Sequence, residues 1–315
     1  MLEYVGLGSR PLDISFRTRS RARVRIVEFP GRWMAADDQA RLLADLRSVV
    51  RDTVEGGTLD YGVLTGSPER WANAILTVIY ADGRAVAFNA LSVLSCELRG
   101  RTVEVLHLGL AMVHPGYQGR GFSGVLYGLT CFLIFARRQL RSLWISSVTQ
   151  VPAVLGLVGE NFERVFPNAR PGARRSHDHL SLAREIMARH RAAFGVAGEA
   201  GFDEDRFVIT NAYTGGSDHL KKRFDDAPKA RGEAFNAMCR RELDYERGDD
   251  FLQIGQWGLK TTHTYFLRMA PQISPLRLTV QFAFLALESS VAPLLQWLKP
   301  QLAMGDIRPR RVART

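Results

Sequence analysis

The chain has 315 residues, of which 46% are hydrophobic and 23% are charged, so it can build a large core and is neither disordered nor fibrous. Its formal net charge of +10 predicts an acidic partner, such as a phosphorylated cofactor, a carrier protein, anionic lipid or nucleic acid. Three widely spaced cysteines, and an N-terminus without a secretory pattern, predict a reducing, cytoplasmic location.

The N-terminal half alternates between strand and helix patterns after a segment, residues 1–20, that we expect to be irregular. Arginines at every second position from Arg17 to Arg25 would share one face of a strand, which is either a solvated face or an anion-docking patch. An Asp-Gly pair predicts a hairpin turn after residue 81. We expect strands over 21–29, 74–80, 86–98, 102–113 and 143–148, and helices over 38–51, 121–138 and 152–162.

This order predicts an α/β fold in which an antiparallel meander ends in a β-α-β crossover. Beyond residue 170 the patterns are weaker. His177-Asp178-His179 is expected in a solvated loop, and because no further Cys or His pair lies nearby, no metal site is expected. The remaining elements predicted are helices over 180–194 and 232–245 and strands over 206–213 and 251–257.

The most apolar segment, 278–298, contains a single charge, Glu288. Its length could just span a bilayer, but Glu288, Gln281 and Pro293 make a span costly. A packed helix pair is the simpler interpretation, and an interfacial anchor or a surface that faces an acyl chain stays open.

A strand that enters a glycine-rich turn and then a helix is the most informative pattern. The bare N–H groups at such a helix start, backed by the helix dipole, form an anion site. Gly119, Gly121 and Gly124 keep side chains away from it. A P-loop is excluded because no Lys-Ser/Thr pair follows, and a Rossmann turn is disfavoured because no acid lies about 20 residues on.

This turn resembles motif A of the GNAT superfamily of acyl-CoA-dependent N-acyltransferases, V-x-P-x-[YF]-[QR]-G-x-G-x-[GA]. Ser123 replaces the usual Gly or Ala at the last position. The hairpin at 80–88 and the segment 146–153 resemble flanking parts of the same family, so the resemblance covers about residues 21–168. The matching residues are Val113, Pro115, Tyr117, Gln118, Gly119 and Gly121.

The resemblance implies an α/β (α+β) fold whose mixed central sheet has splayed fourth and fifth strands, followed by a C-terminal α/β extension. Together with the patterns outside the resemblance, the domains expected are an irregular 1–20, a core over 21–168, an α/β extension packed on the core over 169–272, and an apolar helical segment with a basic tail over 273–315. Acetyl-CoA or another acyl-CoA is the implied cosubstrate. Its pantetheine arm would pair with Ala111, Met112 and Val113, and its pyrophosphate site would comprise Gln118, Gly119, Arg120, Gly121, Phe122, Ser123 and Gly124.

Acyl transfer to an amine needs a base, and His107 lies where one branch of the family has a glutamate base. A buried, hydrogen-bonded structural histidine is the alternative. Glu104 could act through water, and Ser147 or Thr149 could bind substrate or a water relay. The family's tyrosine acid for the leaving thiolate falls on Val158 here, so either another group, such as Tyr127, takes that role or the thiolate leaves without an acid. We expect N-acyl transfer to a primary amine of a small molecule or protein. The alternatives are a long-chain acyltransferase that uses acyl-CoA or acyl carrier protein at a membrane surface, and a non-catalytic acyl-CoA-binding module. No specific nucleic acid is expected.

Overall fold

The computed structural model describes residues 11–18, 21–54, 59, 62–138, 140–214 and 218–268, together with Leu294, Trp297 and Leu298. One eleven-stranded sheet runs through this part of the chain in the order β1-β2-β3-β4-β5-β7-β11-β10-β9, with β6 paired to β4 and β8 paired to β11. The strands are β1 (Asp13–Arg17), β2 (Arg23–Glu28), β3 (Ala74–Ala81), β4 (Arg84–Leu98), β5 (Arg101–His107), β6 (Ala111–Val113), β7 (Leu143–Thr149), β8 (Glu163–Phe166), β9 (Gly201–Asp203), β10 (Val208–Thr210) and β11 (Asp250–Trp257). The predicted α/β class with a mixed sheet is confirmed.

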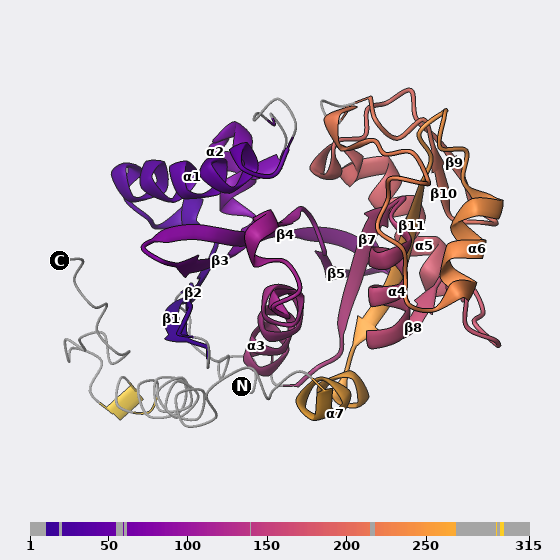
Figure 1. Ribbon diagram of the computed structural model, residues 1–315. Helices are drawn as coiled ribbons and strands as arrows, with labels where there is room; N and C mark the ends of the chain where they lie inside the picture. The colour runs from indigo at the N-terminus through magenta and orange to yellow at the C-terminus, as the bar shows by residue number, and fades with distance from the viewer. Residues whose placement is uncertain are drawn as a thin grey trace.

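Helices cover both faces of the sheet (Figure 1). In the first half, α1 and α2 lie on one face, where α1 packs on β3, and α3 lies on the other, where it packs on β2 and β3. Strands covered on both sides read as continuous apolar runs, as β3 does. The helices are α1 (Ala36–Arg51), α2 (Pro68–Ala72), α3 (Thr130–Arg137), α4 (Pro152–Asn161), α5 (His177–Glu185), α6 (Glu233–Glu242) and α7 (Leu259–Arg268).

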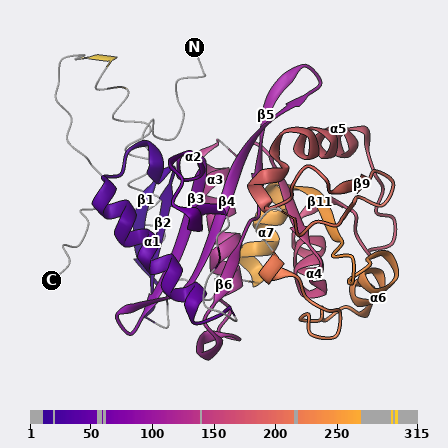
Figure 2. The same ribbon diagram turned by 90° about the horizontal axis from the view of Figure 1, so that it is seen from above.

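The second half continues the same sheet, because β11 lies between β7 and β10. Helix α5 packs on Leu94 and Cys96 of β4, which have the same parity as Phe88 and Ala90 under α1, so α1 and α5 share a face. Helices α4 and α6 pack on the opposite side, around Phe251. Figure 2 shows the β4–β5 hairpin extending past the sheet beside α5. The domain boundary at 168/169 stays a prediction.

The expectation that residues 1–20 are irregular is wrong for 13–17, which form β1 and pair with β2. The alternating arginines therefore do not lie on one strand: the chain turns between Arg17 and Arg23, which face each other across the hairpin. Arg25 is also paired with Asp13 at 3.0 Å, which neutralises part of the predicted patch.

Three further expectations differ from the structure in detail. The strand predicted over 102–113 is divided into β5 and β6, and the strand predicted over 206–213 is only β10. The solvated loop predicted at His177–His179 is wrong, because these residues form the first turn of α5. There Ser176 and His179 form a capping box, and Arg99 binds both carboxylate oxygens of Asp178 at 2.8 and 3.0 Å.

The apolar segment 278–298 lies outside the described residues, apart from Leu294, Trp297 and Leu298, whose side chains are exposed. Among the helices that are described, none is long and apolar enough to cross a bilayer. All three cysteines are free and buried. No cluster of His, Cys, Asp or Glu in the described ranges could hold a metal ion.

Candidate active site

The glycine-rich turn forms an open corner at the start of the helix that becomes α3. Gly119 and Gly121 have φ values of +74° and +73°, a conformation that favours glycine. A Cβ at Gly119 would meet nothing within 4 Å, so no side chain fills the corner at that point. Within the described part of the chain, the N–H groups of residues 119–123 find no backbone acceptor. The corner therefore presents a row of bare donors at a helix N-terminus.

The helix that leaves this corner begins as a π-helical turn, Gly124–Leu129, before it becomes α3. Such wider turns occur often at functional sites. Gly128 is required there for packing, because a Cβ would lie 2.3 Å from the ring of Tyr265.

Strand β6 presents an unpaired backbone edge beside the corner. Leu110 accepts a hydrogen bond from Ala90 at 2.8 Å, and His114 donates to Val86 at 2.9 Å, so alternate residues of this segment bond to β4. Ala111 and Val113 are therefore directed away from β4, and no described strand pairs with that side of β6. Two N–H groups and two carbonyls are left facing β7 across a gap.

The gap begins at Gly109. Before it, β5 pairs in parallel with β7, and the last bond joins Leu108 N to Ser146 O at 2.7 Å. At Gly109 the chain passes so close to β4 that a Cβ would lie 2.4 Å from the carbonyl oxygen of Ala90. The chain leaves β7 at this point, and this separation is the predicted splaying of the fourth and fifth strands.

The gap is a cavity of about 190 Å³. Residues 107–111 line one side, and the end of β7 and the start of α4 line the other. Its far wall comes from the second half of the chain. The lining residues of that wall are Phe194, Ala212, Tyr213, Leu220, Lys222 and Asp250.

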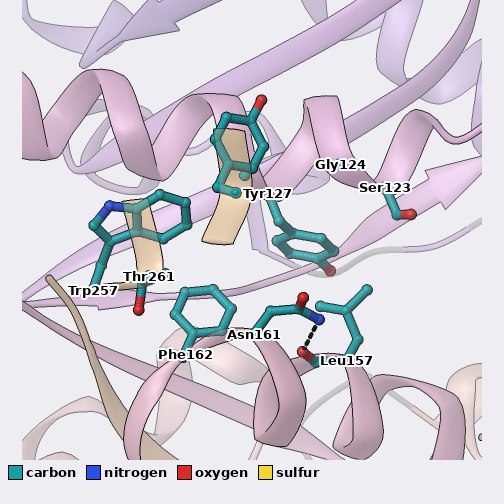
Figure 3. A pocket seen from close by; sticks show the side chains of 10 residues that line it. Ser123, Gly124, Tyr127, Leu157, Asn161, Phe162, Trp257 and Thr261 are labelled. Atoms are coloured by element: carbon teal, nitrogen blue, oxygen red, sulfur yellow. Dashed lines mark hydrogen bonds between the residues drawn. The ribbon is translucent and has the colours of Figure 1, made fainter. Parts of the chain in front are cut away.

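A smaller side pocket of about 50 Å³ lies between the π-helical turn, α4 and α7 (Figure 3). It starts at Ser123 of the corner and the adjacent Gly124, and it shares Tyr127 with the gap. Figure 3 shows Leu157 and Asn161 on the helix facing Tyr127. Tyr127 Oη donates to the carbonyl of Gly109 at 3.3 Å, so this residue stands between the two spaces.

His107 lies at the inner end of the gap, where it is 2% exposed. Its Nδ1 is 3.0 Å from Ser146 Oγ, and its ring lies 5.0 Å from that of Phe194. Burial lowers the pKa of His107 to about 4. A base with so low a pKa accepts a proton from an ammonium group poorly, so the environment disfavours His107 as the proton acceptor.

The other catalytic candidates divide into those inside the gap and those outside it. Ser147, Thr149 and Tyr127 line the gap. Thr149 Oγ1 already accepts the N–H of Val151 at 3.0 Å. Glu104 does not line the gap: its side chain is 43% exposed and forms an ion pair with Arg138. Its strand position, three residues before His107, places it about 10 Å away along β5.

Sequence reasoning missed Asp250, which begins β11 and is 5% exposed on the wall of the gap. Tyr213 Oη donates to Asp250 Oδ1 at 3.0 Å. Burial raises the pKa of Asp250 to about 7; Tyr213 opposes this rise, and Asp249 adds to it. An acid at the start of an apolar strand was the available signal, since such a residue is costly to bury.

No protein-family model and no curated protein matches the sequence. Several solved structures are similar in part. A probable N-acyltransferase from Enterococcus faecalis is 11% identical over 45% of this chain and 33% of its own, with a TM-score of 0.32. An acetyltransferase of the GNAT family from Streptococcus pneumoniae is 17% identical over 40% of this chain and 74% of its own, with a TM-score of 0.26. A mutant AtaT toxin, bound to the C-terminus of the antitoxin AtaR and to acetyl-CoA, is 13% identical over 23% of this chain and 49% of its own, with a TM-score of 0.20.

Proposed function

We propose that this chain transfers an acyl group from acyl-CoA to a primary amine. The observation that carries the proposal is the presence of two unpaired backbone surfaces, the edge of β6 and the corner at residues 119–123, which are joined by residues 114–118. A diphosphate matches the bare donors of the corner. A pantetheine arm, which carries two amide groups, matches the free edge of Ala111 and Val113 in the way that an added strand does.

The residues of the gap then perform the steps that acyl transfer requires. The corner fixes the diphosphate, and β6 holds the arm so that the thioester lies in the cavity beyond Gly109. Acyl-CoA supplies the activated carbonyl. Tyr127, whose hydroxyl already reaches Gly109, can donate a proton to the sulfur that leaves.

The test separates binding from turnover. Titration calorimetry with CoA, acetyl-CoA and palmitoyl-CoA should show one site per chain. A free-thiol assay with acetyl-CoA and ethanolamine, benzylamine, spermidine or a lysine peptide should then show release of CoA that depends on the amine. Binding without release for any of these amines would favour a non-catalytic binding module. Failure of all three CoA ligands to bind would contradict the proposal.

A further inference from the structure

We propose that Asp250 accepts the proton of the acceptor ammonium, in a pocket on the far wall of the gap that is lined by Phe194, Ala212, Tyr213, Leu220 and Lys222. This inference rests on the proposed acyl transfer and adds to it the identity of the base and the side from which the amine arrives.

The position of Asp250 follows from the order of strands. Strand β11 pairs with β7, and Phe251 lies opposite Thr149, so Asp250 is level with the mouth of the gap. Leu252 and Ile254 have the same parity as Asp250 and pack with α5, so Asp250 points to the α5 face of the sheet. The corner starts the helix that covers the opposite face. The amine and the acyl-CoA therefore reach the gap from opposite faces.

The surroundings of Asp250 suit an ammonium with an apolar body. Phe194, Ala212 and Leu220 line this wall of the cavity. A buried carboxylate gains a counter-ion when an ammonium enters, which offsets the cost of its burial. Lys222 lies on the same wall, and Arg247 holds Asp249 at 2.7 Å. The titratable and charged groups around Asp250 are His107, Tyr213, Lys222, Cys239, Tyr245, Arg247 and Asp249.

The ammonium R–NH₃⁺ gives one proton to the carboxylate of Asp250, and the nitrogen lone pair attacks the thioester carbon. The C–N bond forms, the C–S bond breaks, and the sulfur keeps that electron pair. The nitrogen loses its second proton to the sulfur through Tyr127 or water. Asp250 then releases its proton to solvent, so the products are amide, free thiol and one proton.

Asp250 fits this role better than the residues that the sequence favoured. Its pKa, which burial raises to about 7, is close to the working pH, and a base is most effective there. The pKa of His107 is about 4, and Glu104 lies outside the cavity.

Turnover by Asp250→Asn tests the inference, with the most active amine of the panel as substrate. We expect kcat to fall by roughly 100-fold or more, with the Kd for acetyl-CoA within about twofold of the parent value. The parent kcat/KM should fall below about pH 7, where the carboxylate is protonated, and this acidic limb should be absent in the variant. Asp205→Asn is the matched control, because that side chain is 90% exposed, and it should behave as the parent does.

Tyr213→Phe provides a second test that keeps the carboxylate. Because the hydrogen bond from Tyr213 lowers the pKa of Asp250, its loss should move the acidic limb to higher pH. Normal turnover by a folded Asp250→Asn variant would overturn this inference but not the proposed function. An acidic limb of the pH profile that does not move in Tyr213→Phe would do the same. If the parent protein binds no acyl-CoA, the proposed function falls and takes this inference with it.

Discussion

Gly119→Glu is expected to abolish acyl-CoA binding while the chain stays folded. The new carboxylate would extend from the corner into the place of the diphosphate and repel its charge. Each hydrogen bond from an N–H to a charged group contributes about 1.5–3 kcal/mol. Loss of two such bonds would weaken binding by roughly 100-fold to 20,000-fold. Titration calorimetry with CoA measures the change directly.

Gly100→Glu is the matched control for that variant. Gly100 has a φ of +71°, and a Cβ there also meets nothing within 4 Å, but it lies at the β4–β5 turn, at the opposite end of β5 from the gap. Both substitutions place a side chain in the left-handed region, which costs about 1–2 kcal/mol. If both variants lose the same stability and only Gly119→Glu loses CoA binding, the result supports the corner as the diphosphate site. Gly119→Gln separates bulk from charge, and equal CoA affinity in Gly100→Glu and Gly119→Glu would exclude the corner as the diphosphate site.

Gly109→Ala should destabilise the fold and weaken acyl-CoA binding together. The added methyl group would lie 2.4 Å from the carbonyl oxygen of Ala90, a backbone atom that cannot rotate away. Strand β6 must then shift, and the edge formed by Ala111 and Val113 shifts with it. Overpacking of this kind lowers the stability of the fold by about 1–3 kcal/mol. Separately, we expect CoA affinity to fall by about tenfold or more, which corresponds to a loss of about 1.4 kcal/mol or more in binding free energy.

Gly198→Ala isolates the effect of position 109, because a Cβ at Gly198 meets nothing within 4 Å and its φ is not in the left-handed region. Urea unfolding and CoA titration should show little change for this variant. If Gly109→Ala behaves like Gly198→Ala in both measurements, the close approach of Gly109 to the carbonyl of Ala90 does not define the gap.

The local parts of this site could be predicted from the sequence. The turn at residues 118–124 can be recognised in the sequence, because glycine spacing and a following apolar helix are local properties. Strands β3, β4 and β11 have boundaries close to those predicted. The division of the fourth strand at Gly109 could not be seen, since the residues on both sides keep a strand pattern and the cause is a contact with Ala90.

The far wall of the gap depends on contacts between distant parts of the chain. Asp250 reaches the cavity only because β11 inserts beside β7, a pairing between residues about 100 positions apart. Its pKa depends on that burial and cannot be read from its neighbours in sequence. His107 shows the converse: its position on the strand suggested a base, but its burial lowers its pKa to about 4.

Amide hydrogen exchange with and without CoA tests the central claim most directly, because the claim concerns named backbone N–H groups. We expect CoA to slow exchange in peptides that cover residues 111–113 and 119–124, and Gly119→Glu to remove this protection. Unchanged exchange in both peptides at saturating CoA, or protection confined to another part of the chain, would contradict the placement of acyl-CoA between β6 and β7.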